Sequence, residues 1–204
     1  GATIENIDFS KVPHDYKYSS FDDSSWKNAE VIETVIWKEW IKAFGIYQAF
    51  DVKQRPVALL YEKPFSFSEE LVSKVFCDPS VDFVQILPGE KKKMIFALPY
   101  VMNLFPSYGF SGGKDAKVRF TYFERFEKLG VADEEQVLRD DYRNGDVCVY
   151  HLKDQIILDG KPLTYEPFWV KSFRFLQIEI ENADEVLTFY RPKAHRTGYP
   201  LKPK

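Results

Sequence analysis

Apolar and polar residues alternate along the second half of the chain. From Lys117 onward, Val118, Phe120 and Tyr122 fall on one face of an extended segment, because side chains of a strand point to opposite faces in turn. Short apolar runs of the same kind recur as far as Tyr190. This period of two predicts β-strands rather than amphipathic helices.

Turn residues separate these runs. Asp159-Gly160 is typical of a tight hairpin turn, and the glycine-rich stretch 108–114 is interpreted as another turn. Regularly spaced short strands with turns between them indicate a sandwich. The pattern therefore predicts a mainly β protein, an antiparallel β-sandwich of jelly-roll or concanavalin-like type, over residues 77–190. The expected strands are 93–101, 117–126, 147–152, 155–158, 173–180 and 186–190.

The flanks of this segment look different. Residues 1–76 are predicted to be a loop-rich N-terminal extension and linker that packs on the sandwich, and residues 191–204 are predicted to be an exit linker. Residues 29–44 fit the spacing of a helix and the composition of a strand, and we leave both open. Ser68 followed by two glutamates predicts a short helix within 66–75.

Composition excludes some function classes. The formal net charge is −3 and the densest basic run is Lys91-Lys92-Lys93, which is too short to line a nucleic-acid groove. No apolar run approaches the roughly 18 residues of a membrane span. We therefore expect neither a nucleic-acid nor a membrane partner. Cys77 and Cys148 are interpreted as buried free thiols, with a disulfide as the alternative.

Residues for cofactor or metal chemistry do not form recognisable motifs. His14, His151 and His195 lie far apart and show no paired metal-ligand spacing. The glycines near Gly112 lack the ending of a phosphate loop, and the sequence contains no GxSxG nucleophile elbow. We therefore expect no cofactor, no metal site and no catalytic residue within this chain.

One charged pair is predicted to be structural. Glu124 continues the inward register of Tyr122, and Arg174 shares a face with Leu176 and Ile178. An unpaired charge in a core is costly. The hypothesis is an ion pair between Glu124 and Arg174 across the sandwich, with Arg174 donating to sugar hydroxyls in a groove as the alternative.

Three segments carry a resemblance to a known family. They are Phe21-Asp-Asp-Ser-Ser-Trp26, then Gly113-Lys-Asp-Ala-Lys-Val-Arg-Phe-Thr-Tyr-Phe-Glu124, then Pro167-Phe-Trp-Val-Lys-Ser-Phe-Arg-Phe175. In this order they resemble the non-catalytic β-sandwich region of bacterial α-L-rhamnosidases, glycoside hydrolase family 78. The resemblance covers residues 78–190 best.

The resemblance implies an accessory role. In that family such sandwiches precede an α/α-toroid catalytic domain, whose acidic residues act on rhamnose without a cofactor. The expectation is a non-enzymatic, structural segment that supports a catalytic toroid of the same parent chain, beyond the 191–204 linker. The parent is then a hydrolase, a glycosidase of the periplasm or the extracellular space.

A second reading is a carbohydrate-binding module for rhamnose-containing glycans. Such a module needs exposed aromatic rings that line a groove. Trp169, Tyr108 and Phe110 are the first candidates for these sugar contacts.

Overall fold

The computed structural model describes residues 3–30, 59–127, 138–139, 147–149 and 152–200. These residues are mainly β, as the sequence pattern predicts, and the helical turns among them are two short 3-10 helices, η1 (Phe9–Lys11) and η2 (Val75–Cys77). The strands are β1 (Thr3–Asp8), β2 (Tyr61–Ser66), β3 (Glu69–Glu70), β4 (Phe83–Ile86), β5 (Lys91–Gly112), β6 (Lys117–Phe123), β7 (Arg125–Glu127), β8 (Leu138–Arg139), β9 (Val147–Val149), β10 (Leu152–Ile157), β11 (Gly160–Tyr165), β12 (Lys171–Glu181), β13 (Leu187–Tyr190) and β14 (Lys193–Gly198).

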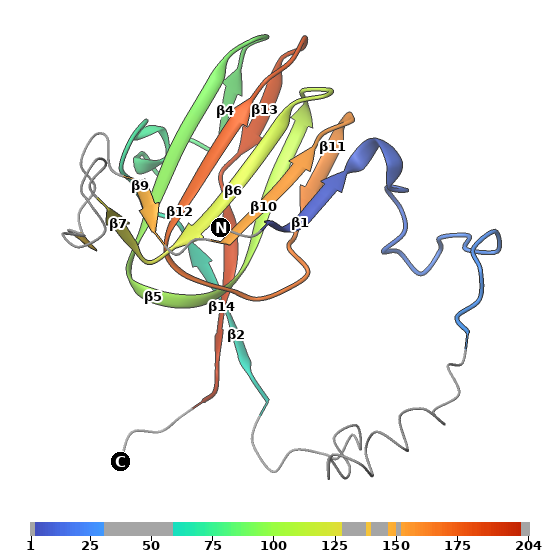
Figure 1. The fold of residues 1–204 in the computed structure, drawn as a ribbon, viewed down its shortest axis with the longest axis horizontal. Helices are drawn as coiled ribbons and strands as arrows, with labels where there is room; N and C mark the ends of the chain where they lie inside the picture. Colours follow the sequence, from blue (N-terminus) through green and yellow to red (C-terminus); the bar gives the residue numbers. More distant parts are fainter. Residues whose placement is uncertain (1–2, 31–58, 128–137, 140–146, 150–151, 201–204) are drawn as a thin grey trace. The chain divides into compact units, whose positions relative to one another are not determined.

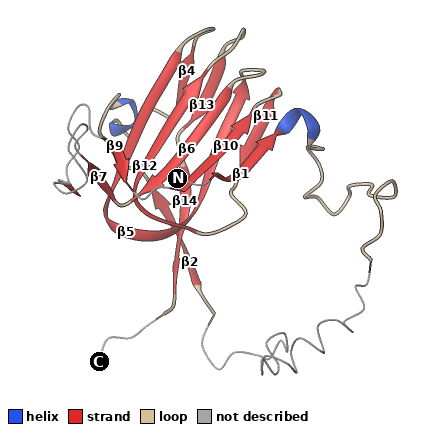
Figure 2. Cartoon of the chain, viewed as in Figure 1, coloured by secondary structure: helices blue, strands red, loops and turns tan. Residues whose placement is uncertain are grey.

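Two layers of strands form a sandwich (Figures 1 and 2). One layer has the order β1-β10-β6-β12-β5, and the other has the order β11-β5-β13-β4. Strand β5 belongs to both layers, so the hydrogen-bonded strands count as one 11-stranded sheet. Most pairs are antiparallel, but β1 pairs with β10 in parallel. The predicted sandwich is confirmed, and the sheet is mixed rather than purely antiparallel.

The 22 residues of β5 turn a corner between the layers. Lys91–Ala97 and Met102–Leu104 pair with β12, whereas Tyr108–Gly112 pairs with β11 and β13. Pro99, Tyr100 and Val101 are exposed where the register with β12 shifts, and the passage to the second layer follows between Leu104 and Tyr108. A bend is needed because one strand must leave the first layer before it can enter the second.

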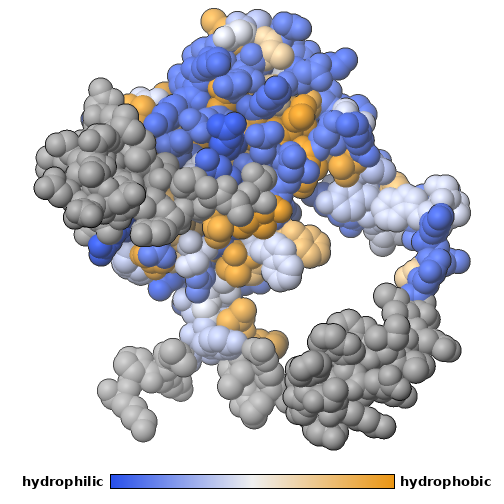
Figure 3. All heavy atoms as spheres, viewed as in Figure 1, coloured by the Kyte–Doolittle hydropathy of each residue, from blue (hydrophilic) through white to orange (hydrophobic). Residues whose placement is uncertain are grey.

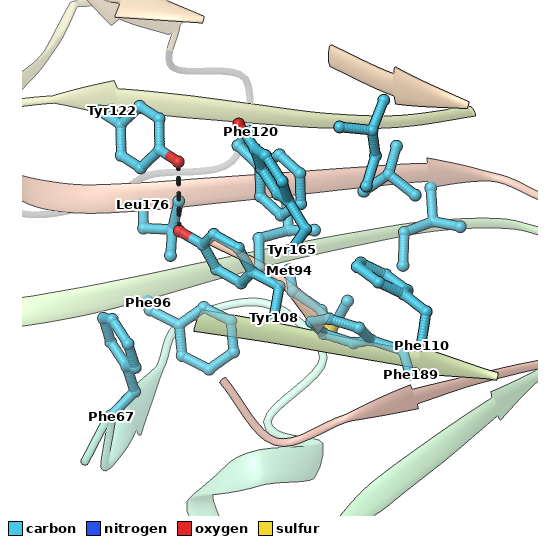
Figure 4. Close-up of a cluster of buried hydrophobic side chains, with 14 of the residues drawn as sticks. Phe67, Met94, Phe96, Tyr108, Phe110, Phe120, Tyr122, Tyr165, Leu176 and Phe189 are labelled. Atoms are coloured by element: carbon cyan, nitrogen blue, oxygen red, sulfur yellow. Dashed lines mark hydrogen bonds between the residues drawn. The ribbon is translucent and has the colours of Figure 1, made fainter. Parts of the chain in front are cut away.

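Aromatic rings from both layers fill the space between them (Figure 4). Tyr108 of the second layer stacks on Phe120 of the first, with ring centroids 4.2 Å apart. Phe110 stacks on Phe189 at 5.2 Å. These contacts follow from the alternation of buried and exposed residues along β5 and β6, which points every second side chain into the core.

A smaller apolar cluster lies on the other face of the first layer. Ile95, Phe123, Phe126 and Phe175 are buried in it. Phe126 belongs to β7, which starts directly after a bend at Glu124. The first layer is therefore covered on both faces at this end.

The folded unit extends beyond residues 77–190. Residues 1–14 and 60–204 cluster as one compact unit, and residues 15–59 as another. Residues 193–198, expected in a linker, instead form β14, which pairs with both β2 and β5. Strand β1, expected in a loop-rich extension, is hydrogen-bonded to β10. Within the second unit, the Asp22 carboxylate accepts a hydrogen bond from Ser24 N–H and closes a turn.

Other local predictions have mixed outcomes. The helix expected within 66–75 is wrong, because Glu69–Glu70 forms strand β3 there. The glycine-rich turn expected at 108–114 is wrong as far as Gly112, which still belongs to β5. Cys77 is a free thiol but exposed, not buried. Most of the ambiguous segment 29–44 lies outside the described residues. No helix in the described ranges is long and apolar enough to cross a membrane.

Candidate functional site

The most unusual exposed feature is the connection between β11 and β12, residues 166–170, which we call the contact loop. Phe168 is 84% exposed and Trp169 is 63% exposed, and Val170 beside them is also exposed. Pro167 is buried and anchors the loop. Runs of three or more consecutive exposed apolar residues are unusual in a folded protein unless they serve a function, such as contact with a partner. The contact loop runs along the end of the sandwich where β5 bends (Figure 1).

The carboxylate of Glu5 holds the contact loop in place. Its Oε1 accepts a hydrogen bond from Phe168 N–H at 2.9 Å, and its Oε2 accepts one from the Tyr165 hydroxyl at 3.0 Å. The Lys171 ammonium donates to the same Oε1 at 3.3 Å. Glu5 lies in β1, so the first strand fixes a loop more than 160 residues later in the chain.

Two buried charges lie beneath Glu5. Lys171 is 2% exposed and Asp154 is 0% exposed, and Lys171 Nζ lies 2.8 Å from Asp154 Oδ2. Burial raises the pKa of the Asp154 carboxyl, and the adjacent Lys171 ammonium opposes that rise. The second oxygen of Asp154 accepts from Glu5 N–H at 3.3 Å. Glu5, Lys171 and Asp154 therefore form a buried charge network that ties β1, β10 and β12 together.

Tyrosine hydroxyls extend this network into the core. Tyr108 donates to the Tyr122 hydroxyl at 3.3 Å (Figure 4), and Lys171 Nζ lies 5.2 Å from the Tyr122 ring centroid. Burial raises the pKa of Tyr108, Tyr122 and Tyr165 above the usual range of a phenol. These hydroxyls therefore stay neutral and act as hydrogen-bonding groups rather than as bases.

Two of the three predicted sugar contacts are wrong. Tyr108 is 0% exposed and Phe110 is 1% exposed. Both rings point into the core because this part of β5 is a strand of the second layer, not a surface turn. Gly109 between them accommodates Tyr190, whose Cβ would lie 3.2 Å from an added Cβ. Trp169 is exposed on the contact loop and remains a candidate.

The reasoning behind the Glu124–Arg174 pair also fails in part. Glu124 is exposed, because the bend between β6 and β7 ends the inward alternation at Phe123. Arg174 is half-buried, at the point where the register between β12 and β5 shifts, because Phe173 pairs with Met102 and Phe175 with Ala97. Its guanidinium lies over the ring of Phe175, which belongs to the smaller apolar cluster, whereas Leu176 belongs to the main core. Glu124 and Arg174 are therefore not two charges within the core, and the cost of burying an unpaired charge no longer supports the ion pair. The pair stays a prediction.

The charge network was missed by the sequence analysis, although one signal was present. Asp154 alternates with Ile156 and Leu158, so the period-two pattern places a carboxylate on the core face. Such a residue requires a buried partner. Nothing in the sequence identifies Lys171 and Glu5 as that partner, because they lie far away along the chain.

The chemistry available to the network is limited. Asp154 is fully buried and Glu5 accepts hydrogen bonds on both oxygens, so neither carboxylate faces a substrate in this arrangement. Within the described part of the chain, no group of three or more His, Cys, Asp or Glu side chains is placed to hold a metal ion. The arrangement can orient and stiffen the contact loop.

The chain is similar to several solved structures. No family model and no curated protein matches the chain. A rhamnosidase from Klebsiella oxytoca with rhamnose bound aligns with 68% of this chain and 29% of its own, at 15% identity and a TM-score of 0.42. A glycosylation-associated protein complex (Gap123) from Streptococcus agalactiae aligns with 84% of this chain and 33% of its own, at 10% identity and a TM-score of 0.32. The chain thus spans about a third of either matched chain.

Proposed function

We propose that this chain is an accessory, non-catalytic β-sandwich segment of an α-L-rhamnosidase-like glycoside hydrolase. In this proposal it supports a catalytic α/α-toroid domain of the same parent protein, in the periplasm or outside the cell. The ordered resemblance of residues 113–124 and 167–175 to that family supports the parent class. The exposed contact loop supports the accessory role, because it offers a surface for contact with another domain.

The exposed aromatic side chains of the contact loop suit a protein interface. Trp and other large aromatic residues contribute most to binding when they enter a pocket of a partner. Rigid presentation lowers the entropy cost of association. Phe168 is fixed through its backbone N–H by Glu5, and Glu5 is itself held by Lys171. The loop is thus ordered before any partner binds.

Two further apolar side chains are exposed on the strands that carry the charge network. Ile4 and Leu152 are both exposed. Ile4 precedes Glu5, which bonds the contact loop, and Leu152 starts β10 two residues before Asp154. Figure 3 shows hydrophobic side chains gathered toward the end of the body from which β2 and β14 extend. Exposed apolar side chains that gather on one part of a surface are typical of interaction sites.

Co-purification tests the interface. The 204-residue chain is produced together with a separately encoded α/α-toroid domain of a bacterial α-L-rhamnosidase. We expect a complex that Trp169→Ser or Phe168→Ser weakens by about tenfold or more, as for hot-spot residues. Phe83→Ser is the matched control, because Phe83 is a half-exposed ring in β4. An equal loss with all three variants, or no complex with the unaltered chain, would contradict the proposal.

An activity assay tests the non-catalytic part separately. The purified chain is incubated with 4-nitrophenyl α-L-rhamnoside, and release of nitrophenol is measured. We expect no hydrolysis above the buffer rate. Hydrolysis that Glu5→Gln or Asp154→Asn abolishes without unfolding the chain would make the protein an enzyme and would overturn the proposal.

Sugar binding by Trp169 is the second candidate function, since its ring is exposed. The Phe168 and Trp169 rings are T-shaped, with centroids 5.9 Å apart and an interplanar angle of 72°. They therefore do not form one flat platform, and only one of them can stack on a given pyranose ring. Calorimetric titration with rhamnose and rhamnose-containing oligosaccharides separates the two functions: heat at millimolar sugar that is lost in Trp169→Ala favours sugar binding.

A further inference from the structure

The lysine and the carboxylates of the buried charge network lie close enough to react with one another. Lys171 Nζ is 2.8 Å from Asp154 Oδ2 and 3.3 Å from Glu5 Oε1. Since a carbon–oxygen bond is short, Nζ also lies within about 4 Å of the carboxyl carbon of Asp154. An amine and a carboxylic acid condense to an amide, and a well-oriented pair within one molecule reacts at an effective concentration of about 10⁵ to 10⁸ M.

The surroundings of this pair disfavour charged groups. Lys171 is 2% exposed and Asp154 is 0% exposed, and the Tyr122 ring centroid lies 5.2 Å from Nζ. Removing a charge from water to such a place is costly, and burial raises the pKa of the Asp154 carboxyl. Transfer of one proton from the ammonium to the carboxylate gives a neutral amine beside a neutral acid, which are the reactive forms. Exclusion of water also protects an amide from hydrolysis.

Glu5 contacts both reacting groups. Its backbone N–H donates to Asp154 Oδ1 at 3.3 Å, so it faces the negative charge that develops on this oxygen when a nucleophile attacks the carboxyl carbon. Its side-chain Oε1 lies 3.3 Å from Lys171 Nζ, where it can take a proton from the attacking nitrogen. Hydrogen bonds from the Tyr165 hydroxyl and from Phe168 N–H hold the same carboxylate in position. One residue thus supplies an oxyanion donor and a general base.

We propose that Lys171 and Asp154 join spontaneously through an amide bond, with Glu5 as the catalytic residue. Nζ attacks Cγ of Asp154, a nitrogen–carbon bond forms, and the Cγ–Oδ2 bond breaks. Of the three protons of the ammonium, one stays on the amide nitrogen and two leave with Oδ2 as water. Glu5 Oε1 carries one of these two protons from Nζ to the leaving oxygen and ends unchanged. The reaction consumes no oxidant and no second substrate.

The bond closes a covalent ring from Asp154 to Lys171 that contains β11 and the contact loop. It also ties β10 to β12 across β6, which lies between them in the first layer. Such a crosslink constrains the unfolded chain, as a disulfide does. The free energy of the ion pair is measured on chains that have not yet reacted, which intact mass identifies. Bond formation requires neither a partner domain nor a sugar, so it is independent of the accessory role proposed above.

Intact-mass spectrometry of the folded 204-residue chain during incubation at neutral pH tests the bond. We expect the main species to become lighter than the sequence by one water molecule. Trypsin and chymotrypsin together cut the chain between Asp154 and Lys171, so a peptide containing one residue is expected to stay joined to a peptide containing the other. Full mass in the folded, unaltered chain would overturn the proposal. A loss of water confined to Asp159-Gly160, where an aspartyl residue can close to a cyclic imide, would overturn it too.

Variants assign the roles. Lys171→Arg keeps the positive charge, but a guanidinium stays protonated and is a poor nucleophile, so we expect full mass, as in Asp154→Ala. Glu5→Gln is expected to slow the loss of water by about a hundredfold or more, as removal of a general base does. Lys161→Arg is the control and should react at the unaltered rate, because the Lys161 side chain is 70% exposed and pairs with Asp159 at 3.9 Å. Loss of water in Lys171→Arg, or an unchanged rate in Glu5→Gln, would contradict the mechanism. If a variant fails to fold, the joined peptide of the unaltered chain still decides.

Discussion

Replacing Lys171 by Met removes the central cation of the buried charge network. Lys171 is 2% exposed and lies 2.8 Å from Asp154 and 3.3 Å from Glu5. Methionine keeps much of the volume of the lysine stem, so packing changes little. Breaking a buried pair by removing one partner costs about 3 to 5 kcal/mol, because the other charge stays buried. We expect the free energy of unfolding to fall by that amount.

Urea unfolding followed by circular dichroism measures this loss. The matched control is Lys161→Met, because the Lys161 side chain is 70% exposed and its Nζ makes a long ion pair of 3.9 Å with Asp159. Exposed ion pairs contribute about 0 to 1 kcal/mol, so the control is expected to lose little stability. A loss below about 1 kcal/mol in Lys171→Met, or an equal loss in both variants, would refute the view that the network stabilises this end of the sandwich.

The pH dependence of the Lys171→Met variant checks the mechanism. Burial raises the pKa of Asp154, and Lys171 is the group that opposes the rise. Without the lysine, the folded carboxyl holds its proton to a higher pH than the unfolded carboxyl does. Stability is therefore greatest below the unfolded pKa and falls as pH rises through the folded one. We expect the loss of unfolding free energy in Lys171→Met to become smaller at acid pH. Adding Asp154→Asn to Lys171→Met is expected to remove this pH dependence.

Three further predictions concern the rest of the fold. Gly112→Ala is expected to cost about 1 to 3 kcal/mol in thermal unfolding, because φ is +76° and the new Cβ would lie 2.3 Å from the Val186 carbonyl oxygen. Arg191→Ala is expected to cost about 2 to 4 kcal/mol in urea unfolding, because the guanidinium donates to several backbone carbonyls, among them that of Phe76 at 2.8 Å. Tyr122 is expected to stay un-ionised until the protein unfolds in alkali, which absorbance at 295 nm measures, because burial raises its pKa.

Each of these predictions has its own control. Gly89→Ala shares the positive φ but meets no atom within 4 Å, so it isolates the cost of the backbone conformation from that of the clash. Arg191→Lys keeps the charge but not the fork, and it should not restore stability if hydrogen bonds to several carbonyls matter. For Tyr122 the sign follows from linkage: a phenol whose pKa is raised on folding stabilises the folded state below pH 10 and loses that contribution at higher pH. Early ionisation in the folded protein would contradict the burial argument.

Period-two alternation was sufficient to predict the β architecture and the inward face of β6. It was also present from Met102 to Phe110, where every second residue is buried. There the glycine at 109 was interpreted as part of a turn, although it serves the close approach of Tyr190. Local sequence does not distinguish a glycine that makes a turn from one that makes room for a neighbouring side chain.

The candidate site depended on information that local patterns do not contain. A bend after Phe123 and a shift of register between β12 and β5 beside Arg174 each interrupt the alternation of faces, and neither has a sequence marker here. The contact between Glu5 and Phe168 joins residues 163 positions apart. Only the three-dimensional pairing of strands could show that these residues meet.

The sharing of β5 by both layers has a mechanical consequence. In a sandwich whose layers are joined only by loops, one sheet can slide or open while the other keeps its hydrogen bonds. Here the backbone of a single strand passes through both layers, so shear between them must distort the peptide chain between Leu104 and Tyr108. The two sheets should therefore exchange their amide hydrogens as one cooperative unit, with a common opening free energy for residues 94–97 and 108–111.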